Sequence, residues 1–284
     1  QQLLTEGKAF STLLRFSLPF LLSNILQACY GASDLFMVGR FADSISVSAV
    51  ATGGQIMQTI TGLAIGLATG GTVLIGQYFG ARKIAEVSNI VKTIIVVFSV
   101  LSLVMTALTI LFLEPLITLM QVPLAAVSTT RQYLLICSCG IIFIVGYNAI
   151  SGILRGLGDS RTPLLLITIA CLINISTDLL FVGLFRMGAV GAALSTVLAQ
   201  AISLLAALYL SAKGFWYKYN NYAPHFSLSA ARQVLMTGLP IALQEGLVNI
   251  SFLIITVTLY RRKVFLFSCL LERTGTPEQM LLLR

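Results

Sequence analysis

The sequence predicts an all-α protein, a polytopic bundle of transmembrane helices. Of its 284 residues, 57% are hydrophobic and only 10% are charged, whereas a soluble domain carries about 25% charged residues. The apolar residues also come in long runs. No charged residue occurs from Ser44 to Ala81, and Asp178 is the only one between Thr162 and Phe185. Because about 20 apolar residues are enough to cross a bilayer, these runs indicate membrane spans.

Seven spans are expected from these runs. The connections between them are rich in Gly, Pro, Asp, Asn and Ser, which are typical of turns and loops. The predicted spans are residues 14–38, 48–78, 90–113, 132–154, 163–185, 189–211 and 234–258. They group into a six-helix lobe over residues 1–211, a cytoplasmic linker over 212–233, a seventh helix over 234–258 and a tail over 259–284.

The basic residues indicate how the spans are oriented. The net charge is +8, but the sequence has no basic patch with interleaved aromatic residues of the kind that binds nucleic acid. With a cytoplasmic N-terminus, the inner segments hold Lys8, Arg15, Arg82, Lys83, Lys92, Arg155, Arg161, Lys213, Lys218 and Arg232. The outer connections then hold only Arg40, Arg131 and Arg186. This bias predicts a multi-pass protein of the plasma (inner) membrane with its N-terminus in the cytoplasm.

The tail departs from this pattern. Arg261, Arg262 and Lys263 follow the seventh span and would lie outside, and the apolar stretch Val264–Leu271 is too short to cross a bilayer. We interpret residues 259–284 as an ending that is not the original one, such as a frame-shifted segment.

One internal repeat relates the first and seventh spans. Residues 14–22 and 235–243 share a pattern that aligns Pro19 with Pro240, six spans apart. A six-span repeat is typical of transporters whose two halves move against each other. Because proline removes one helical hydrogen bond, both prolines are expected to act as helix hinges.

A polar stripe on the first span ends at an acid. Asn24, Gln27, Gly31 and Asp34 are spaced so that they share one helical face, and Tyr30 lies one turn before Asp34. Such a stripe is expected to line a cavity, and an ionisable residue within a span is by default a functional candidate. The alternative is that Asp34 lies near the outer interface, where it only snorkels or caps.

Two further acids occur within predicted spans. Asp178 follows Asn174 by one turn, and their oxygens could accept a proton or coordinate Na⁺. The alternative is a structural hydrogen bond between helices, worth about 0.6–2 kcal/mol. Glu245, with Gln244 beside it, lies five residues after Pro240, and both are candidates for cavity lining.

Other chemistry is not indicated. The sequence has no GxxxxGK[ST], HExxH or GxSxG motif, so an enzyme is not expected. The five cysteines form no CxxC pair, and no cofactor is expected beyond a coupling H⁺ or Na⁺. Two sets of glycines are expected to be structural. Gly62, Gly66 and Gly70 should allow close helix packing, and Gly152, Gly156 and Gly158 should serve turn geometry.

Short segments in a fixed order suggest a family. They are Ser33–Arg40, Gly76–Arg82, Leu154–Pro163, Asn174–Asp178, Gly188–Thr196 and Gly238–Gln244. Together they resemble the multidrug and toxic compound extrusion (MATE) family between residue 11 and about residue 256.

This resemblance implies a twelve-helix antiporter that exports cationic or amphipathic compounds in exchange for Na⁺ or H⁺. The chain would supply the six-helix N-lobe and the first helix of an otherwise missing C-lobe, so transport is expected to be incomplete. The matching acids Asp34 and Asp178 and the amide Asn174 would belong to an N-lobe cation site. Glu245 does not match the family's glutamate on the seventh span, which lies further past the proline.

The mechanism we expect places Asp34 and Asp178 on one cavity. Two carboxylates in a dry site do not readily ionise together, so H⁺ or Na⁺ from outside would neutralise the pair, and the helices around Pro19 would repack to release substrate. Rival hypotheses are a lipid-linked sugar flippase, a non-transporting membrane fragment and a seven-span receptor-like protein. A flippase should line its cavity with Lys or Arg, and the predicted spans contain almost none.

Overall fold

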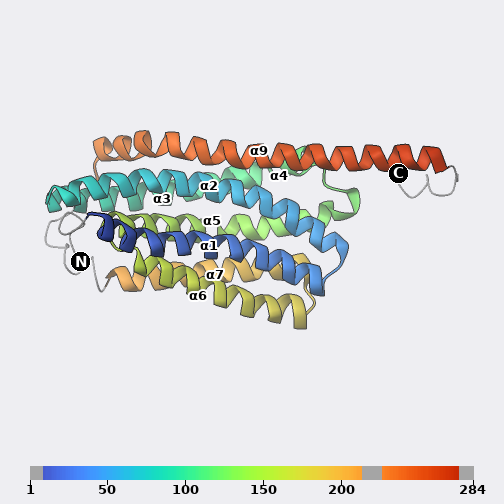
Figure 1. Cartoon of the computed structure of the whole chain (residues 1–284), viewed down its shortest axis with the longest axis horizontal. Helices are drawn as coiled ribbons and strands as arrows, with labels where there is room; N and C mark the ends of the chain where they lie inside the picture. The colour runs from blue at the N-terminus through green and yellow to red at the C-terminus, as the bar shows by residue number, and fades with distance from the viewer. Residues whose placement is uncertain (1–8, 213–225, 275–284) are drawn as a thin grey trace.

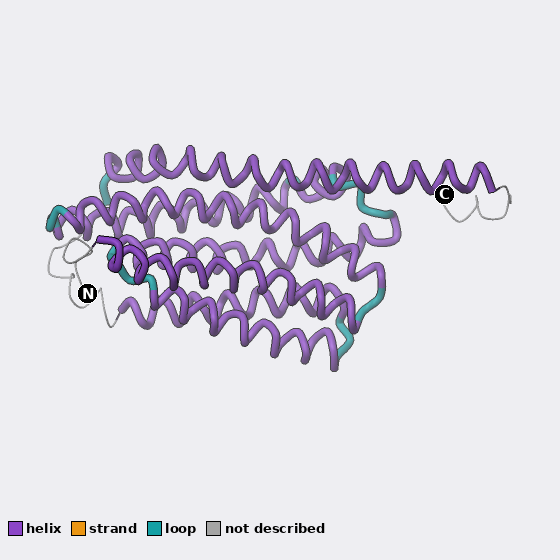
Figure 2. The backbone as a smooth tube through the Cα atoms, viewed as in Figure 1, coloured by secondary structure: helices purple, strands orange, loops and turns teal. Residues whose placement is uncertain are grey.

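Long helices make up the part of the chain that the structure, a computed structural model, describes: residues 9–212 and 226–274. The helices are α1 (Ala9–Phe41), α2 (Ser44–Gly80), α3 (Ile84–Leu111), α4 (Leu113–Leu119), α5 (Leu124–Gly156), α6 (Arg161–Asp178), the π-helix η1 (Leu179–Leu184), α7 (Gly188–Ser211) and α9 (Leu228–Thr274). All except α4 and η1 are long, and they run roughly alongside one another (Figure 1). Within the described ranges only helices and short loops occur (Figure 2), which confirms the predicted all-α bundle.

Six of the described helices are long and apolar enough to cross a membrane: α2, α3, α5, α6 with η1, α7, and α9 as far as Phe252. The first predicted span corresponds to α1, which is 33 residues long. It is not one of these six. The chain is therefore a multi-pass membrane protein, and each predicted span coincides with a helix.

The helix boundaries differ from the prediction mainly near the seventh span. The helix α9 begins at Leu228, inside the predicted linker, and runs to Thr274, well into the predicted tail. Residues 259–274 contain neither glycine nor proline, so nothing in their sequence stops the helical hydrogen bonding. The rest of the predicted linker, residues 213–225, and of the tail, residues 275–284, lies outside the described residues.

The helix α2 lies at the centre of the contacts. It packs against α5 on one side and α9 on another, while α6 bridges α1 and α7. A Cβ at Gly152 of α5 would lie 3.1 Å from the carbonyl oxygen of Ala68, and one at Gly156 would lie 2.8 Å from that of Thr72. These two glycines therefore allow close packing on α2, contrary to the predicted turn role. Gly158 does take a turn conformation, with φ +82°.

The contact between α2 and α9 is closer still. Gly66 faces the backbone of Ala242, and Gly70 faces the backbone of Gly238. At Gly62, one turn further along, a Cβ would lie 2.7 Å from the amide nitrogen of the Asn249 side chain. We call these facing positions the α2–α9 seam. They confirm that the glycines spaced by four serve close helix packing.

Polar side chains cap two of the helices. At the start of α2, Asp43 accepts a hydrogen bond from the backbone N–H of Ser46 at 3.0 Å. Hydrogen bonding from Ser46 lowers the pKa of the Asp43 carboxyl from its ordinary value. At the start of α6, Asp159 accepts hydrogen bonds from the backbone N–H groups of Arg161 and Thr162 at 3.1 and 3.0 Å. Both acids satisfy N–H groups that the first helical turn leaves without partners.

Candidate functional site

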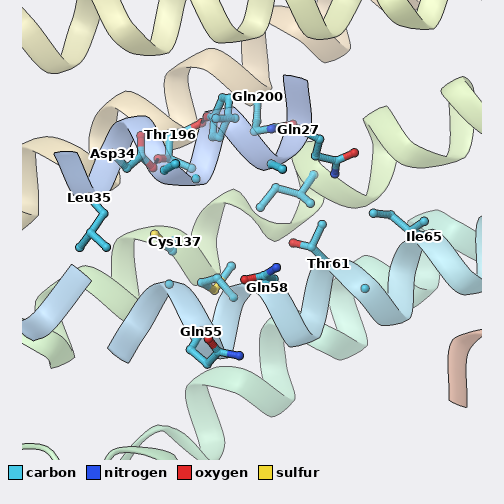
Figure 3. A pocket seen from close by; sticks show the side chains of 18 of the residues that line it. Gln27, Asp34, Leu35, Gln55, Gln58, Thr61, Ile65, Cys137, Thr196 and Gln200 are labelled. Carbon is cyan, nitrogen blue, oxygen red and sulfur yellow. Dashed lines mark hydrogen bonds between the residues drawn. The ribbon is translucent and has the colours of Figure 1, made fainter. Parts of the chain in front are cut away.

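A cavity of about 690 Å³ lies between α1, α2, α5, α6, α7 and α9, with α6 contributing Ile167. Amide side chains dominate its polar wall: Asn24, Gln27, Gln55, Gln58, Asn148, Gln200 and Asn249. Among the residues that the structure describes, its only charged lining residues are the acids Asp34 and Glu245, and no lysine, arginine or histidine lines it. In Figure 3, Asp34, Thr196 and Gln200 lie on one side, and Gln58 and Thr61 of α2 lie opposite them. The described polar wall of the cavity is thus rich in amides and carries two acidic side chains.

The stripe on α1 faces this cavity. Asn24, Gln27, Gly31 and Asp34 all line it, and so does Tyr30. Asp34 is only 6% exposed, so its carboxyl group is held inside the bundle. The helical period that groups these residues on one face is what brings them to the cavity together.

Asp34 is held by α7. The hydroxyl of Thr196 donates a hydrogen bond to Asp34 Oδ2 at 2.8 Å, and the hydroxyl of Tyr30 donates to the carbonyl oxygen of Thr196 at 3.2 Å. The other oxygen, Asp34 Oδ1, has no hydrogen-bond partner within the described part of the chain. Sequence reasoning missed Thr196. Its one available signal was Gln200, which lies a turn later on the same face of α7.

Asn174 and Asp178 lie behind the cavity wall. Both residues are 0% exposed and neither lines the cavity. The charge of Asp178 and the amide of Asn174 both lie close enough to Asp34 to influence its carboxyl group. Among the residues that the structure describes, neither oxygen of Asp178 and neither polar side-chain atom of Asn174 has a hydrogen-bond partner. Buried polar groups without partners are costly. A proton or a small cation would relieve that cost, and the oxygens of Asp34, Asp178 and Asn174 are suited to holding one.

The helix changes its geometry directly after Asp178. Residues Leu179–Leu184 form η1, a π-helix that continues α6. Such segments are rare and often occur at functional sites, because they leave backbone groups out of the regular α-helical ladder. The π-helix was not predicted, since no residue type reliably marks it.

Of the two candidate lining residues on α9, only one faces the cavity. Glu245 lines the cavity and is half-buried, whereas its neighbour Gln244 is exposed and does not line it. Consecutive residues on an α-helix point in directions about 100° apart, so only one of the two can face inward. The helices α1 and α9 both continue through Pro19 and Pro240, and the hinge role of these prolines stays a prediction.

Comparisons with known proteins bear on this arrangement. A family model described as MatE matches residues 19–180, more than half of the chain. The chain belongs to the MatE family. Among curated MatE relatives, it is 33% identical over 205 residues to the probable multidrug resistance protein YpnP of Bacillus subtilis, which covers 72% of the chain and 46% of that protein. It is 28% identical over 213 residues to the probable multidrug resistance protein YoeA of the same organism, covering 72% and 46%.

Solved MatE structures share the fold. A MOP superfamily transporter from Pyrococcus furiosus matches with a TM-score of 0.74 and 26% identity, covering 82% of this chain and 52% of that one. An outward-facing multidrug resistance MATE transporter matches with a TM-score of 0.73 and 26% identity, covering 82% and 52%. The chain therefore spans about half the length of these relatives, and the relatives are transporters.

Proposed function

We propose that this chain forms the ion-coupled part of an efflux path for cationic or amphipathic compounds, with H⁺ or Na⁺ held by Asp34, Asp178 and Asn174. One observation carries the proposal. Asp178 and Asn174 are fully buried with no hydrogen-bond partner among the described residues, and they interact with an acid on the wall of a polar cavity. Buried polar side chains without partners are better explained by a bound proton or small ion than by a structural hydrogen bond between helices.

Coupling follows from the proximity of the acids. When no ion is bound, two carboxylates in a dry setting repel each other, and binding of H⁺ or Na⁺ removes that repulsion. An ion that binds one conformation more tightly than the other shifts the conformational equilibrium towards it. The size of that shift is limited by the difference between the two binding free energies. The Thr196 hydroxyl, which holds Asp34 at 2.8 Å, connects this change to α7.

The cavity supports the substrate class. Its volume of about 690 Å³ falls in the range of about 300–1,000 Å³ that is usual for small-molecule sites. Asp34 and Glu245 line the cavity, and no basic residue of the described ranges does, which favours positively charged ligands. Several relatives are named as multidrug resistance or multidrug export proteins, and we extend that kind of substrate to this chain.

The position of the cavity supports an opening to the outside. The α2 residues that line it run from Val50 to Ile65, and none from Gly66 to Gly80 does. In that half, Gly66 and Gly70 lie directly against the backbone of α9. The sealed half lies at the same end of the bundle as the α2–α3 connection with Arg82 and Lys83. The positive-inside rule assigns that end to the cytoplasm of a plasma-membrane protein.

The rival functions receive less support. A flippase for lipid-linked sugars would need basic residues in its cavity to hold phosphates, and none of the described basic residues lines this one. The similarity to multidrug resistance proteins and to solved transporters favours a transporter over a receptor. The missing C-lobe remains part of the proposal, since the relatives are about twice as long as the matched segment.

The test uses the whole chain, purified in lipid nanodiscs, with ethidium as the cationic probe. If the acid pair holds the coupling ion, ethidium affinity will change with pH or Na⁺ concentration, since two ligands that share conformations influence each other's binding. We expect Asp34→Asn and Asp178→Asn to abolish this dependence.

The matched control for this test is Glu114→Gln. Glu114 is an exposed acid that pairs with Arg131 at 2.7 Å and does not line the cavity, so its removal should leave the ion dependence unchanged. An ion dependence that survives in both aspartate variants would overturn the proposal.

A further inference from the structure

We infer that Glu245, supported by Asn249, binds the positive charge of the transported compound, while the Asp34–Asp178 pair holds the coupling ion. The inference rests on the proposed function and deepens it by dividing two roles between two acidic sites. The ligand class is an organic cation with an aromatic or other apolar body.

The first argument is access. Asp178 and Asn174 are 0% exposed and do not line the cavity, so a drug-sized molecule cannot touch them and only a small ion can. Glu245 is half-buried and lines the cavity. Of the three acids within the spans, it is therefore the most open to a large ligand.

The second argument is the local construction of α9 and α2. Asn249 lies one turn after Glu245, is 8% exposed and lines the cavity. Its side-chain amide donates to the carbonyl oxygen of Glu245 at 2.9 Å. Across the interface, a Cβ at Gly62 would lie 2.7 Å from that amide nitrogen and 3.8 Å from the Cβ of Glu245. Any residue larger than glycine at position 62 would therefore push the Asn249 amide out of its place.

The third argument is charge. Within the described part of the chain no lysine, arginine or histidine forms an ion pair with Glu245, and none lines the cavity. A carboxylate inside a membrane protein without a counter-ion is costly. A bound organic cation would supply that counter-ion, and the aromatic faces of Tyr30 and Tyr133, which also line the cavity, can stack against its apolar body.

Gln244, the neighbour of Glu245, allows a test of whether the position of the carboxylate matters for binding. Gln244 is exposed and does not line the cavity, so the double variant Gln244→Glu/Glu245→Gln moves the carboxylate out of the cavity and keeps the composition of α9. Ethidium binding by fluorescence anisotropy would be compared in the whole chain, Glu245→Gln and the double variant, in nanodiscs of zwitterionic lipid. An uncharged phenanthridine of similar size serves as the second probe.

We expect both variants to bind ethidium roughly tenfold more weakly, the loss of one partly screened charge interaction. They should bind the uncharged phenanthridine as the unmodified chain does, which also shows that the cavity is still folded. The dependence of ethidium affinity on pH or Na⁺ should remain, because the Asp34–Asp178 pair is untouched.

Each other outcome has a separate meaning. Unchanged ethidium affinity in Glu245→Gln overturns the inference and leaves the proposed function standing. Loss of the ion dependence in Glu245→Gln also overturns it, since Glu245 would then belong to the ion site. If the unmodified chain binds no ethidium, the proposed function itself fails.

Discussion

The hydroxyl of Thr196 holds one oxygen of Asp34, and the other oxygen has no partner among the residues that the structure describes. The acid is therefore fixed in orientation but is still able to take a ligand. The same division occurs on α9, where the Asn249 amide is committed to the backbone of Glu245 and the Glu245 carboxylate is left to face the cavity. Thr196 thus holds the carboxyl group of Asp34 directly, and Asn249 holds the backbone beside Glu245. Both carboxyl groups keep oxygen atoms that can still accept a hydrogen bond or a cation.

The Thr196 hydrogen bond can be tested by an isosteric change. Thr196→Val removes the hydroxyl and leaves Asp34 Oδ2 buried without its donor, which should lower the free energy of unfolding by about 1–3 kcal/mol. Thr196→Ser keeps the hydroxyl and should retain most of the stability. Thermal unfolding in detergent compares the three proteins, and equal midpoints for the valine and serine variants would show that the hydrogen bond contributes nothing.

At the scale of helices, α2 determines how tightly the bundle closes. Its glycines face α9 along the seam, and its opposite side receives Gly152 and Gly156 of α5. The hydroxyl of Thr72 adds a hydrogen bond to the carbonyl oxygen of Gly152 at 2.9 Å. Because backbones are in contact on both sides, α2 has little room to shift unless α5 or α9 moves with it.

The seam predicts unequal effects of one substitution at two positions of α2. Gly66→Ala places a methyl group against the backbone of Ala242, whereas at Gly54 the nearest atom to a Cβ would be the hydroxyl oxygen of Tyr133, 4.0 Å away. Both changes gain the same helix propensity, about 0.5–1 kcal/mol. We expect Gly54→Ala to be neutral or stabilising and Gly66→Ala to lower stability by about 1–3 kcal/mol, as measured by thermal unfolding. Equal effects at both positions would contradict the seam.

Much of this arrangement follows from sequence patterns. Long apolar runs predict the membrane spans. The helical period predicts that Asn24 and Asp34 share one face of α1, and glycines spaced by four predict that α2 packs closely against another helix. The remaining features depend on how the helices are rotated and paired. Whether Gln244 or Glu245 faces inward is set by the neighbours of α9, and Thr196 matters only because α7 lies beside α1. The continuation of α9 to Thr274 was missed because hydropathy marks where a span ends and not where a helix ends.

At the scale of the whole molecule, the sidedness of the bundle is the property that function depends on most. Both the α2–α3 connection and the start of α9 lie at one end, and the α1–α2 connection lies at the other (Figure 1). The basic residues Arg82 and Lys83 mark the first of these ends and the acid Asp43 marks the second. Outward opening of the cavity requires that the second end face the cell exterior.

Cysteine labelling in intact cells tests this orientation. In a background with the native cysteines replaced by serine or alanine, an Asp43→Cys variant should react with a membrane-impermeant maleimide from outside. A Lys83→Cys variant should react only after the cells are permeabilised. The reverse pattern would place the N-terminus outside and would require the cavity to open toward the cytoplasm.

The burial of Asn174 and Asp178 behind the cavity wall also bears on how such a protein can diversify. Substitutions among the amides that line the cavity alter what a ligand meets without altering the groups held behind the wall. New compounds could therefore be accommodated by successive changes at Gln55, Gln58 or Gln200, each neutral for the buried acids. Under the proposed function, the range of bound compounds could then change while the residues proposed to hold the ion stay the same.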